Sequence, residues 1–233
     1  MSVAYSIVIP AFNEERTIAR AIREAHRFFT SFSKPFEIIV VDDGSSDRTA
    51  EIVNEMSREI PELRLLRHGE NRGKGVAVQT GFAHADGEII LFFDADLSTH
   101  PVEFTKFLPA LRSADIVIGS RRVRGSRIAI PQSFYRTFGG RIFNFFLRAV
   151  TGLPYHDTQC GFKAFRARTK YLFRDLSCTG WMFDVEILLR AHADGYRIAE
   201  VPVTWRHGAE SRVRLRDAWK IFRDILRITK ISK

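Results

Sequence analysis

Short apolar segments alternate with helical stretches through the first half of the chain. The apolar segments are rich in β-branched residues and predict strands at 6–10, 37–41, 63–66, 89–93 and 115–118. Helical patterns fill the intervals at 15–29, 48–59, 74–85 and 102–113. This order predicts an α/β fold with a doubly wound, mostly parallel sheet flanked by helices. Because such sheets bind ligands at the carboxyl ends of their strands, we expect the site in the loops there.

The length and composition fit one large domain. The chain has 233 residues, 45% of them hydrophobic, with no internal repeat or linker-like tract, so we expect a single domain over residues 1–233. Cys160 and Cys178 form no CxxC pair, which argues against a disulfide framework. A strand predicted at 5–9 leaves no space for a signal peptide, and no run of about 18 uncharged apolar residues occurs. We expect a cytoplasmic protein.

Charge is divided unevenly along the chain. Residues 1–118 contain 13 Lys and Arg against 18 Asp and Glu, whereas residues 119–233 contain 23 against 9. The second half therefore carries a net charge of +14 and is expected to face an anionic partner. Nucleic acid, a membrane surface and a phosphorylated substrate all fit that charge. The alternative is a basic surface that serves solubility alone.

Two aspartates follow the predicted strand at 89–93. Residues of an extended segment that are two positions apart point to the same side, so Asp94 and Asp96 could hold one divalent cation against a phosphate. For an isolated pair of this kind, two solvated carboxylates in a turn is the alternative. The interpretation therefore depends on the other loops.

Polar loops also follow the first two predicted strands. Residues 10–14 and 42–47 lack the GxGxxG pattern of dinucleotide-binding folds. A strand-end aspartate could accept hydrogen bonds from the N–H groups of a pyrimidine or guanine, or from a ribose hydroxyl, and Phe12 could stack on a base. A turn with a helix cap explains 42–47 equally well. Residues 69–74 resemble a phosphate-binding P-loop, but the spacing is one residue short and Gly75 replaces the metal-binding Ser or Thr. Lys74 could still face a diphosphate, or simply begin a helix.

The ordered set of motifs resembles the family-2 glycosyltransferases, which have the GT-A fold. The segments that carry the resemblance are 10–14, 41–45, 71–75, 94–96 and 119–121. The similarity is greatest to synthases that attach a hexose to dolichyl or polyprenyl phosphate. Segments 157–163 and 181–186 look particularly like dolichyl-phosphate glucosyltransferases. The resemblance covers nearly the whole chain. It implies a nucleotide-sugar-binding half at 1–118 and a basic, partly helical half at 119–233 that faces the acceptor and the membrane.

The resemblance also implies roles for individual residues. The nucleotide pocket would be formed by Pro10, Phe12, Glu14, Val40, Asp42, Asp43, Lys74, Asp94 and Ala95. Of the two neighbouring aspartates in that pocket, we favour Asp42 as the contact to the base. Asp94 and Asp96 would position Mg²⁺ or Mn²⁺. Mannosyl relatives often have Gln as a third ligand; Ser98 stands there in this chain, so a water could complete the site. The residues expected at the reaction centre are Asp96, Arg121, Arg206 and Arg212.

The implied reaction is an inverting transfer of a hexose from a nucleotide sugar to a polyprenyl or dolichyl phosphate. UDP-glucose is the favoured donor because of segment 157–163, and GDP-mannose is the next candidate. A lipid phosphate is ionised at neutral pH and needs arginines rather than a general base. A sugar or polysaccharide acceptor would need a base, for which Asp157, Asp184 and Glu186 are candidates. The last two could instead be carboxylates that stabilise a helix N-terminus. We expect no chemical role for Cys160, His100 or His156.

Two basic amphipathic patterns occur in the second half, at 134–149 and 215–229. Such helices can lie in a membrane interface, or pack on a core in the ordinary way. Beside a lipid-phosphate acceptor, they predict a peripheral protein on the cytosolic membrane face. A nucleic-acid-binding module is a further alternative, but no recognised nucleic-acid motif accompanies the basic residues, and we expect no nucleic-acid partner.

Overall fold

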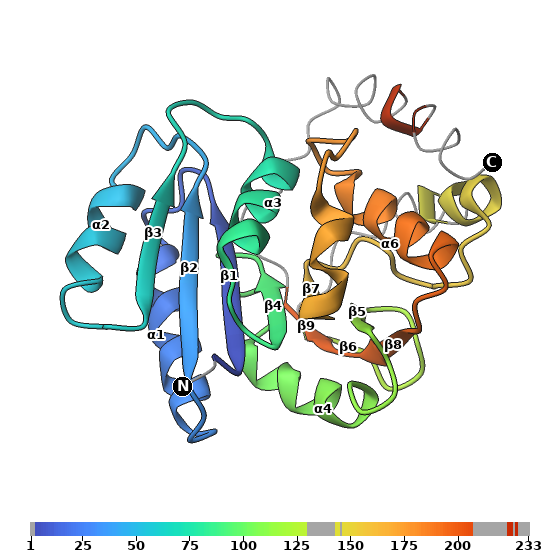
Figure 1. Cartoon of the computed structure of the whole chain (residues 1–233), viewed down its shortest axis with the longest axis horizontal. Helices are drawn as coiled ribbons and strands as arrows, with labels where there is room; N and C mark the ends of the chain where they lie inside the picture. Colours follow the sequence, from blue (N-terminus) through green and yellow to red (C-terminus); the bar gives the residue numbers. More distant parts are fainter. Residues whose placement is uncertain (1–2, 130–142, 145, 207–222, 226, 228–233) are drawn as a thin grey trace.

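A twisted β-sheet runs through the centre of the molecule (Figure 1). The computed structural model describes residues 3–129, 143–144, 146–206, 223–225 and 227. Within these residues, seven strands form one sheet in the order β3-β2-β1-β4-β7-β5-β8. Their bounds are β1 Tyr5–Ala11, β2 Phe36–Asp42, β3 Leu63–Arg67, β4 Ile89–Phe93, β5 Ile116–Ser120, β7 Phe162–Arg166 and β8 Ile198–Pro202. A separate pair consists of β6 (Arg127–Ile128) and β9 (Thr204–Trp205).

The sheet is mostly parallel, as predicted. β2 pairs in parallel with β3 and β1, β1 with β4, and β5 with β8. All five predicted strands are present, and no end differs from the prediction by more than two residues. The exception to the parallel pattern is β7, which runs antiparallel between β4 and β5. The second half of the chain thus supplies β7 and β8 to the same sheet as the first.

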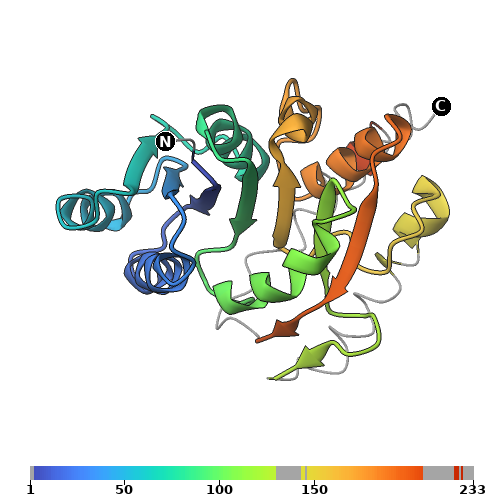
Figure 2. The ribbon, with the colours of Figure 1, turned by 60° about the horizontal axis from the view of Figure 1, so that its bottom comes forward.

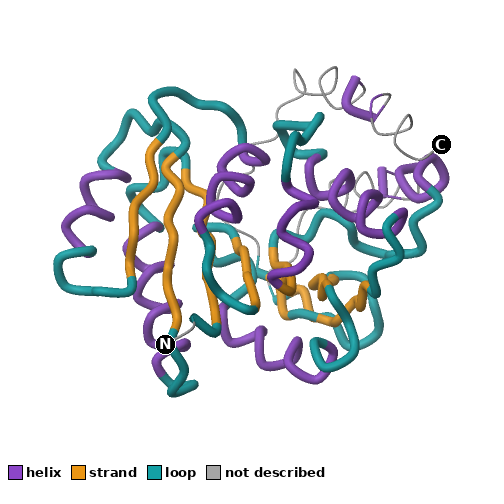
Figure 3. The backbone as a smooth tube through the Cα atoms, in the orientation of Figure 1, coloured by secondary structure: helices purple, strands orange, loops and turns teal. Residues whose placement is uncertain are grey.

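Helices cover both faces of the sheet (Figures 2 and 3). On one face, Ile7 and Ile9 of β1 lie in the apolar cluster that includes α1 (Ile18–Thr30), α2 (Thr49–Met56), η1 (Pro101–Lys106) and α4 (Phe107–Ala110). On the other face, Val8 lies in the cluster that includes α3 (Lys74–His84), η2 (Ala167–Phe173) and α6 (Phe183–Ala193). Strand residues on both faces are apolar because each face is covered, which is typical of parallel sheets.

The predicted single helix at 102–113 was wrong. A 3₁₀ segment, η1, is followed by the four-residue helix α4. Pro109 explains the interruption, because it has no N–H group to continue the helical hydrogen bonds and its ring restricts the turn before it. Pro101 occupies the first turn of η1, where its missing N–H costs nothing.

Close packing of α3 on β1 depends on Gly81. A Cβ atom at this position would lie 2.3 Å from Cγ1 of Val8 and 3.3 Å from Cγ2 of Val41. Both valines are fully buried, so neither can move aside easily. Gly81 therefore sets the distance between this helix and the sheet, and with it the position of Lys74 at the start of the helix.

We expect Gly81→Ala to destabilise the protein by about 1–3 kcal/mol through overpacking. Gly180→Ala is the matched control, because a Cβ there meets no atom within 4 Å. The measurement is thermal or urea unfolding of both variants. Equal stability of the two would contradict the packing argument.

Candidate active site

Asp94 and Asp96 lie in a tight turn directly after β4. The N–H of Leu97 donates to the carbonyl oxygen of Asp94 at 3.1 Å, and Leu97 has a left-handed φ of 55°. The extended conformation expected for this pair was therefore wrong. Asp96 is exposed, and its two carboxylate oxygens accept the N–H and the hydroxyl of Ser98 at 2.8 and 2.7 Å. Ala95 between the two aspartates is buried.

Lys74 contacts Asp94 across the site. Its Nζ lies 2.6 Å from Asp94 Oδ1. The ring centroids of Trp181 and Phe183 lie 5.5 and 6.0 Å from Nζ of Lys74. Burial alone would lower the pKa of Lys74, but the negative charges of Asp94, Asp184 and Asp96 outweigh it and raise the pKa. A positive charge therefore already faces the carboxylate of Asp94.

The neighbouring residues Asp42 and Asp43 have different surroundings. Asp43 accepts the main-chain N–H groups of Arg72 and Gly73 at 3.0 and 2.8 Å, and its Oδ1 lies 2.7 Å from Nδ1 of His68. It is thus occupied in holding the loop before α3. Asp42 is fully buried, and its Oδ2 accepts no hydrogen bond although Nε of Arg67 lies 3.1 Å away. Of the two aspartates, Asp42 is thus the one with a carboxylate oxygen that accepts no hydrogen bond.

The loops after β1 and β2 are joined to each other. Asn13, with a left-handed φ of 53°, donates its N–H to Oγ of Ser45 at 2.9 Å and accepts the N–H of Ser46 at 2.9 Å. The N–H of Glu14 donates to Oγ1 of Thr49 at 2.8 Å. The side chains of Pro10 and Val40 are buried, whereas Phe12 and Glu14 are partly exposed beside these loops. Of the predicted pocket residues, Val40 and Ala95 have their side chains in the apolar core.

Arg121 follows β5 and is held by Asp157. Its Nε and Nη2 donate to the two carboxylate oxygens at 2.7 and 2.8 Å, and its N–H donates to Oδ2 at 2.9 Å. The guanidinium also lies 5.6 Å from the ring of Trp205. Burial would raise the pKa of Asp157, but Arg121 outweighs burial and lowers it. Asp157 is thus the ionised partner of an arginine and not a free base.

The other two proposed bases are also engaged. Glu186 is fully buried, accepts the N–H groups of Ser177 and Cys178 at 2.9 and 2.7 Å, and pairs with Arg190 at 2.6 Å. Asp184 lies 2.6 Å from Nζ of Lys163, and burial raises its pKa despite that positive neighbour.

The residues for which no chemical role was expected are otherwise engaged. His100 and His156 lie 3.2 and 3.0 Å from Glu24 and Glu200. Burial raises the pKa of Cys160 to about 11, which fits a packing residue.

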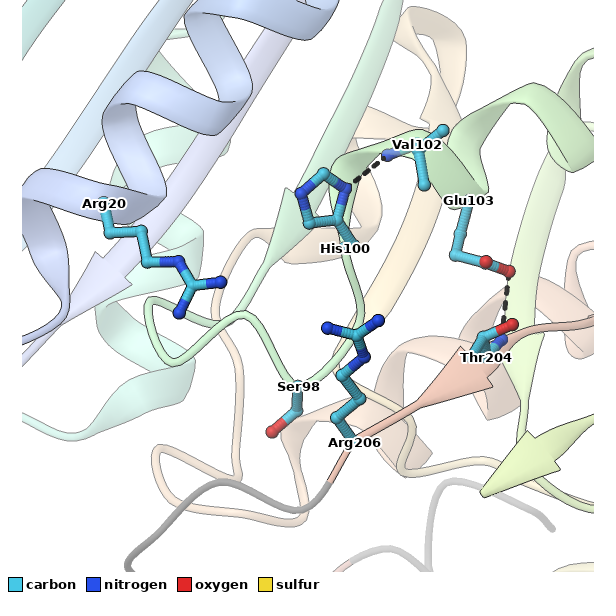
Figure 4. Close-up of a pocket in the computed structure, with 7 residues that line it drawn as sticks. All are labelled: Arg20, Ser98, His100, Val102, Glu103, Thr204 and Arg206. Atoms are coloured by element: carbon cyan, nitrogen blue, oxygen red, sulfur yellow. Dashed lines mark hydrogen bonds between the residues drawn. The ribbon is translucent and has the colours of Figure 1, made fainter. Parts of the chain in front are cut away.

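A hollow of about 310 Å³ lies beside the turn of Asp96. Its walls are Arg20, Ser98, His100, Val102, Glu103, Thr204 and Arg206. The guanidinium groups of Arg20 and Arg206 both point into it (Figure 4). The N–H of Arg206 donates to the carbonyl oxygen of Ser98 at 2.8 Å, which ties β9 to the turn. Arg206 was predicted from the sequence and Arg20 was not, because a single arginine in an amphipathic helix carries no signal.

Part of the predicted site lies outside the described residues. Arg212 belongs to this part, as do most of the two basic amphipathic patterns at 134–149 and 215–229. Within the part of the chain that is described, no helix has both the length and the apolar character needed to cross a bilayer.

Comparisons with known proteins agree on one family. Residues 6–173 match the sequence model of Glycosyl transferase family 2. The chain is 35% identical over 235 residues to a dolichyl-phosphate beta-glucosyltransferase of Trichomonas vaginalis, with 96% of this chain and 70% of the relative covered. It is 32% identical over 247 residues to the dolichyl-phosphate beta-glucosyltransferase of Saccharomyces cerevisiae, with 95% and 72% covered.

A solved structure shows the same fold. It is glucosyl-3-phosphoglycerate synthase from Mycobacterium tuberculosis in complex with Mn²⁺, UDP-glucose and phosphoglyceric acid. The TM-score is 0.70 at 21% identity, with 99% of this chain and 79% of the other covered. This likeness confirms the expected GT-A architecture, and the family model covers more than half of the sequence. The chain therefore belongs to glycosyl transferase family 2.

Proposed function

We propose that this protein transfers glucose from UDP-glucose to dolichyl phosphate or another polyprenyl phosphate, with inversion at the anomeric carbon. The similarity to dolichyl-phosphate beta-glucosyltransferases carries the proposal, because it extends over 96% of the chain and so includes the acceptor half. A β-linked product from an α-linked donor requires attack on the face of the sugar opposite the departing diphosphate.

The donor would lie across the carboxyl ends of β1, β2 and β4. Asp42 is the proposed contact to the base, since its buried Oδ2 accepts no hydrogen bond and contacts Arg67 through an ion pair at 3.1 Å. Phe12 and Glu14 would line the same pocket from the loop after β1. Lys74, at the start of α3, would face the diphosphate, where the helix N-terminus adds favourable electrostatics.

The residues around Asp94 fit a divalent cation. The carboxylates of Asp94 and Asp96 supply the oxygen ligands that Mg²⁺ and Mn²⁺ prefer. The cation would share Asp94 with the ammonium group of Lys74, which lies 2.6 Å from Oδ1. Among the described residues, no group of three or more His, Cys, Asp or Glu is arranged to hold a metal. Mg²⁺ or Mn²⁺ would therefore take Asp94 and Asp96 as ligands, with Ser98 directly or through water, and donor phosphate oxygens for the rest. When bound, the cation would stabilise the charge that develops on the leaving diphosphate.

The ion pairs formed by the three candidate bases favour a phosphate acceptor over a sugar hydroxyl. A sugar hydroxyl would need a general base, but Asp157, Asp184 and Glu186 each form an ion pair. An ionised phosphate needs only positive charge to hold it near the donor. Arg121 supplies a fixed guanidinium at the carboxyl end of β5, and the hollow between Arg20 and Arg206 supplies two more. Arg212 is proposed to add to this set. Peripheral binding at the cytosolic membrane face is part of the same proposal.

The test of this function is a transfer assay with the full chain. With radiolabelled UDP-glucose, Mn²⁺ and dolichyl phosphate in detergent micelles, we expect a labelled lipid product, and none after chelation by EDTA. GDP-mannose replaces the donor in one control, and soluble sugars replace the acceptor in another. Label transferred only to soluble sugars would favour the alternative acceptor class. No transfer from any nucleotide hexose would refute the proposal.

The Arg121–Asp157 pair makes a separate prediction. Asp157→Asn should destabilise the protein by about 3 kcal/mol, because it leaves a largely buried guanidinium without a countercharge. Adding Arg121→Gln to that variant should restore part of the loss. Because the pKa of Asp157 is lowered on folding, its contribution is present above the ordinary carboxyl pKa of about 3.9 and is lost as the pH falls through the folded value.

Urea unfolding between pH 3 and pH 7 measures this contribution. The difference between the wild-type protein and Asp157→Asn should stay constant from neutral pH to about pH 5 and shrink below it. A pH-independent difference, or equal stability of the two proteins at pH 7, would be the contrary result.

A further inference from the structure

Segment 157–163 leads into the start of β7, which lies beside the end of β4. β7 runs antiparallel to β4, with Phe162 opposite Phe93 and Lys163 opposite Phe92. Continuing that register by one residue places Gly161 opposite Asp94. The segment that distinguished this chain as glucosyltransferase-like thus faces the aspartate of the diphosphate site.

Gly161 leaves the space that the Asp94 carboxylate occupies. A Cβ atom at residue 161 would lie 2.1 Å from Oδ2, 2.7 Å from Cγ and 3.0 Å from Oδ1 of Asp94. These three nearest atoms all belong to one side chain. Gly161 is not among the described glycines with a positive φ, so its backbone conformation does not itself require glycine. Glycine is required at residue 161 because the Asp94 carboxylate occupies the space that a side chain would fill.

The backbone of this segment is anchored on both sides of Gly161. Lys163 is 1% exposed, and its Nζ donates to the carbonyl oxygen of Cys160 and to Asp184, both at 2.6 Å. Asp157 is held by Arg121 through three hydrogen bonds. Because both flanks are buried and paired, the segment cannot easily retreat from a side chain added at residue 161. The carboxylate of Asp94 would have to move instead.

If the Asp94 carboxylate moved, its contacts with the neighbouring residues would change. Asp94 is held on one side by Lys74, 2.6 Å from Oδ1, and packs on the other side against Gly161. A methyl group at residue 161 occupies the place of Oδ2, so the side chain must rotate toward the open part of the site. Both the distance to Lys74 and the direction of the free lone pairs then change.

We propose that Gly161 is a positioning residue that sets the orientation of Asp94 toward the cation and diphosphate of the donor. The inference rests on the proposed function only in making Asp94 a ligand of the cation–diphosphate group. It assigns to segment 157–163 a role at the diphosphate, distinct from any choice of sugar.

The first test is calorimetric titration of UDP into Gly161→Ala, with Mn²⁺ and with EDTA. We expect binding in Mn²⁺ to weaken at least tenfold and binding in EDTA to change less than twofold. Gly69→Ala is the control, because a Cβ there meets no atom within 4 Å and the residue is exposed. Equal Mn²⁺-dependent binding by the two variants would overturn the proposal.

A double-variant cycle keeps the test valid if Gly161→Ala is unstable. Asp94→Ala removes all three atoms that the new Cβ would meet. In that background, Gly161→Ala should alter the melting temperature and UDP binding no more than Gly69→Ala does. An equal cost in both backgrounds would show that Gly161 acts through something other than Asp94. These measurements need no acceptor, so they remain informative if no glucose transfer is found. Normal glucose transfer by Gly161→Ala would refute the role of Gly161 and leave the proposed function standing.

Discussion

The carboxylate of Asp94 lies between the ammonium group of Lys74 on one side and the backbone of Gly161 on the other. Three segments meet there: β4 supplies Asp94, α3 supplies Lys74, and the residues before β7 supply Gly161. Two of these segments, α3 and the start of β7, depend in turn on other contacts. Gly81 sets how closely α3 approaches the sheet, and the buried pair of Lys163 with Asp184 holds the start of β7. The geometry of the site is therefore a consequence of how the whole sheet is covered and paired.

The acidic residues near the site mostly organise other groups. Asp43 holds two main-chain N–H groups of the loop before α3, Asp157 holds Arg121, and Glu186 holds the turn at 177–178. Carboxylate oxygens that already accept these hydrogen bonds have few lone pairs left to take a proton from a substrate. In contrast, Arg20 and Arg206 present their guanidinium groups to a hollow. This division of roles is what a reaction between two phosphate-bearing substrates would need, and a lipid phosphate acceptor is consistent with it.

Local patterns predicted most of the fold. The five apolar segments became strands because their side chains can be buried on both faces of a covered sheet. β7 was missed because Lys163 and Arg166 interrupt its apolar pattern. The buried ammonium group of Lys163 is acceptable there because it pairs with Asp184 and donates to the carbonyl oxygen of Cys160. The helix at 102–113 failed at Pro109, a local signal that was present in the sequence. The turn at Asp94 was taken as extended, since the left-handed residue that closes it is Leu97 and not glycine.

The sequence predicted individual residues of the candidate site, but it did not predict the contacts between them. Motif order pointed to Asp94, Asp96 and Arg121 as candidate site residues, and the structure places Asp94 in contact with Lys74. The separation of Asp42 from Asp43 depends on His68, Arg72 and Gly73, which no spacing rule connects to residue 43. Asp157 was considered as a base, because its pairing with Arg121 spans 36 residues of sequence. Long-range contacts decide the roles of residues whose chemistry is visible locally.

The proposed role of Asp94 is to hold a divalent cation on the diphosphate of the donor. Electron paramagnetic resonance measures it directly, because free Mn²⁺ gives a six-line signal that is lost on binding. UDP alone binds some of the Mn²⁺ and removes part of this signal. When the wild-type protein is present together with UDP, the signal should fall further, because the protein and UDP bind Mn²⁺ jointly. Asp94→Asn should abolish that extra binding. Undiminished binding by Asp94→Asn would contradict the account.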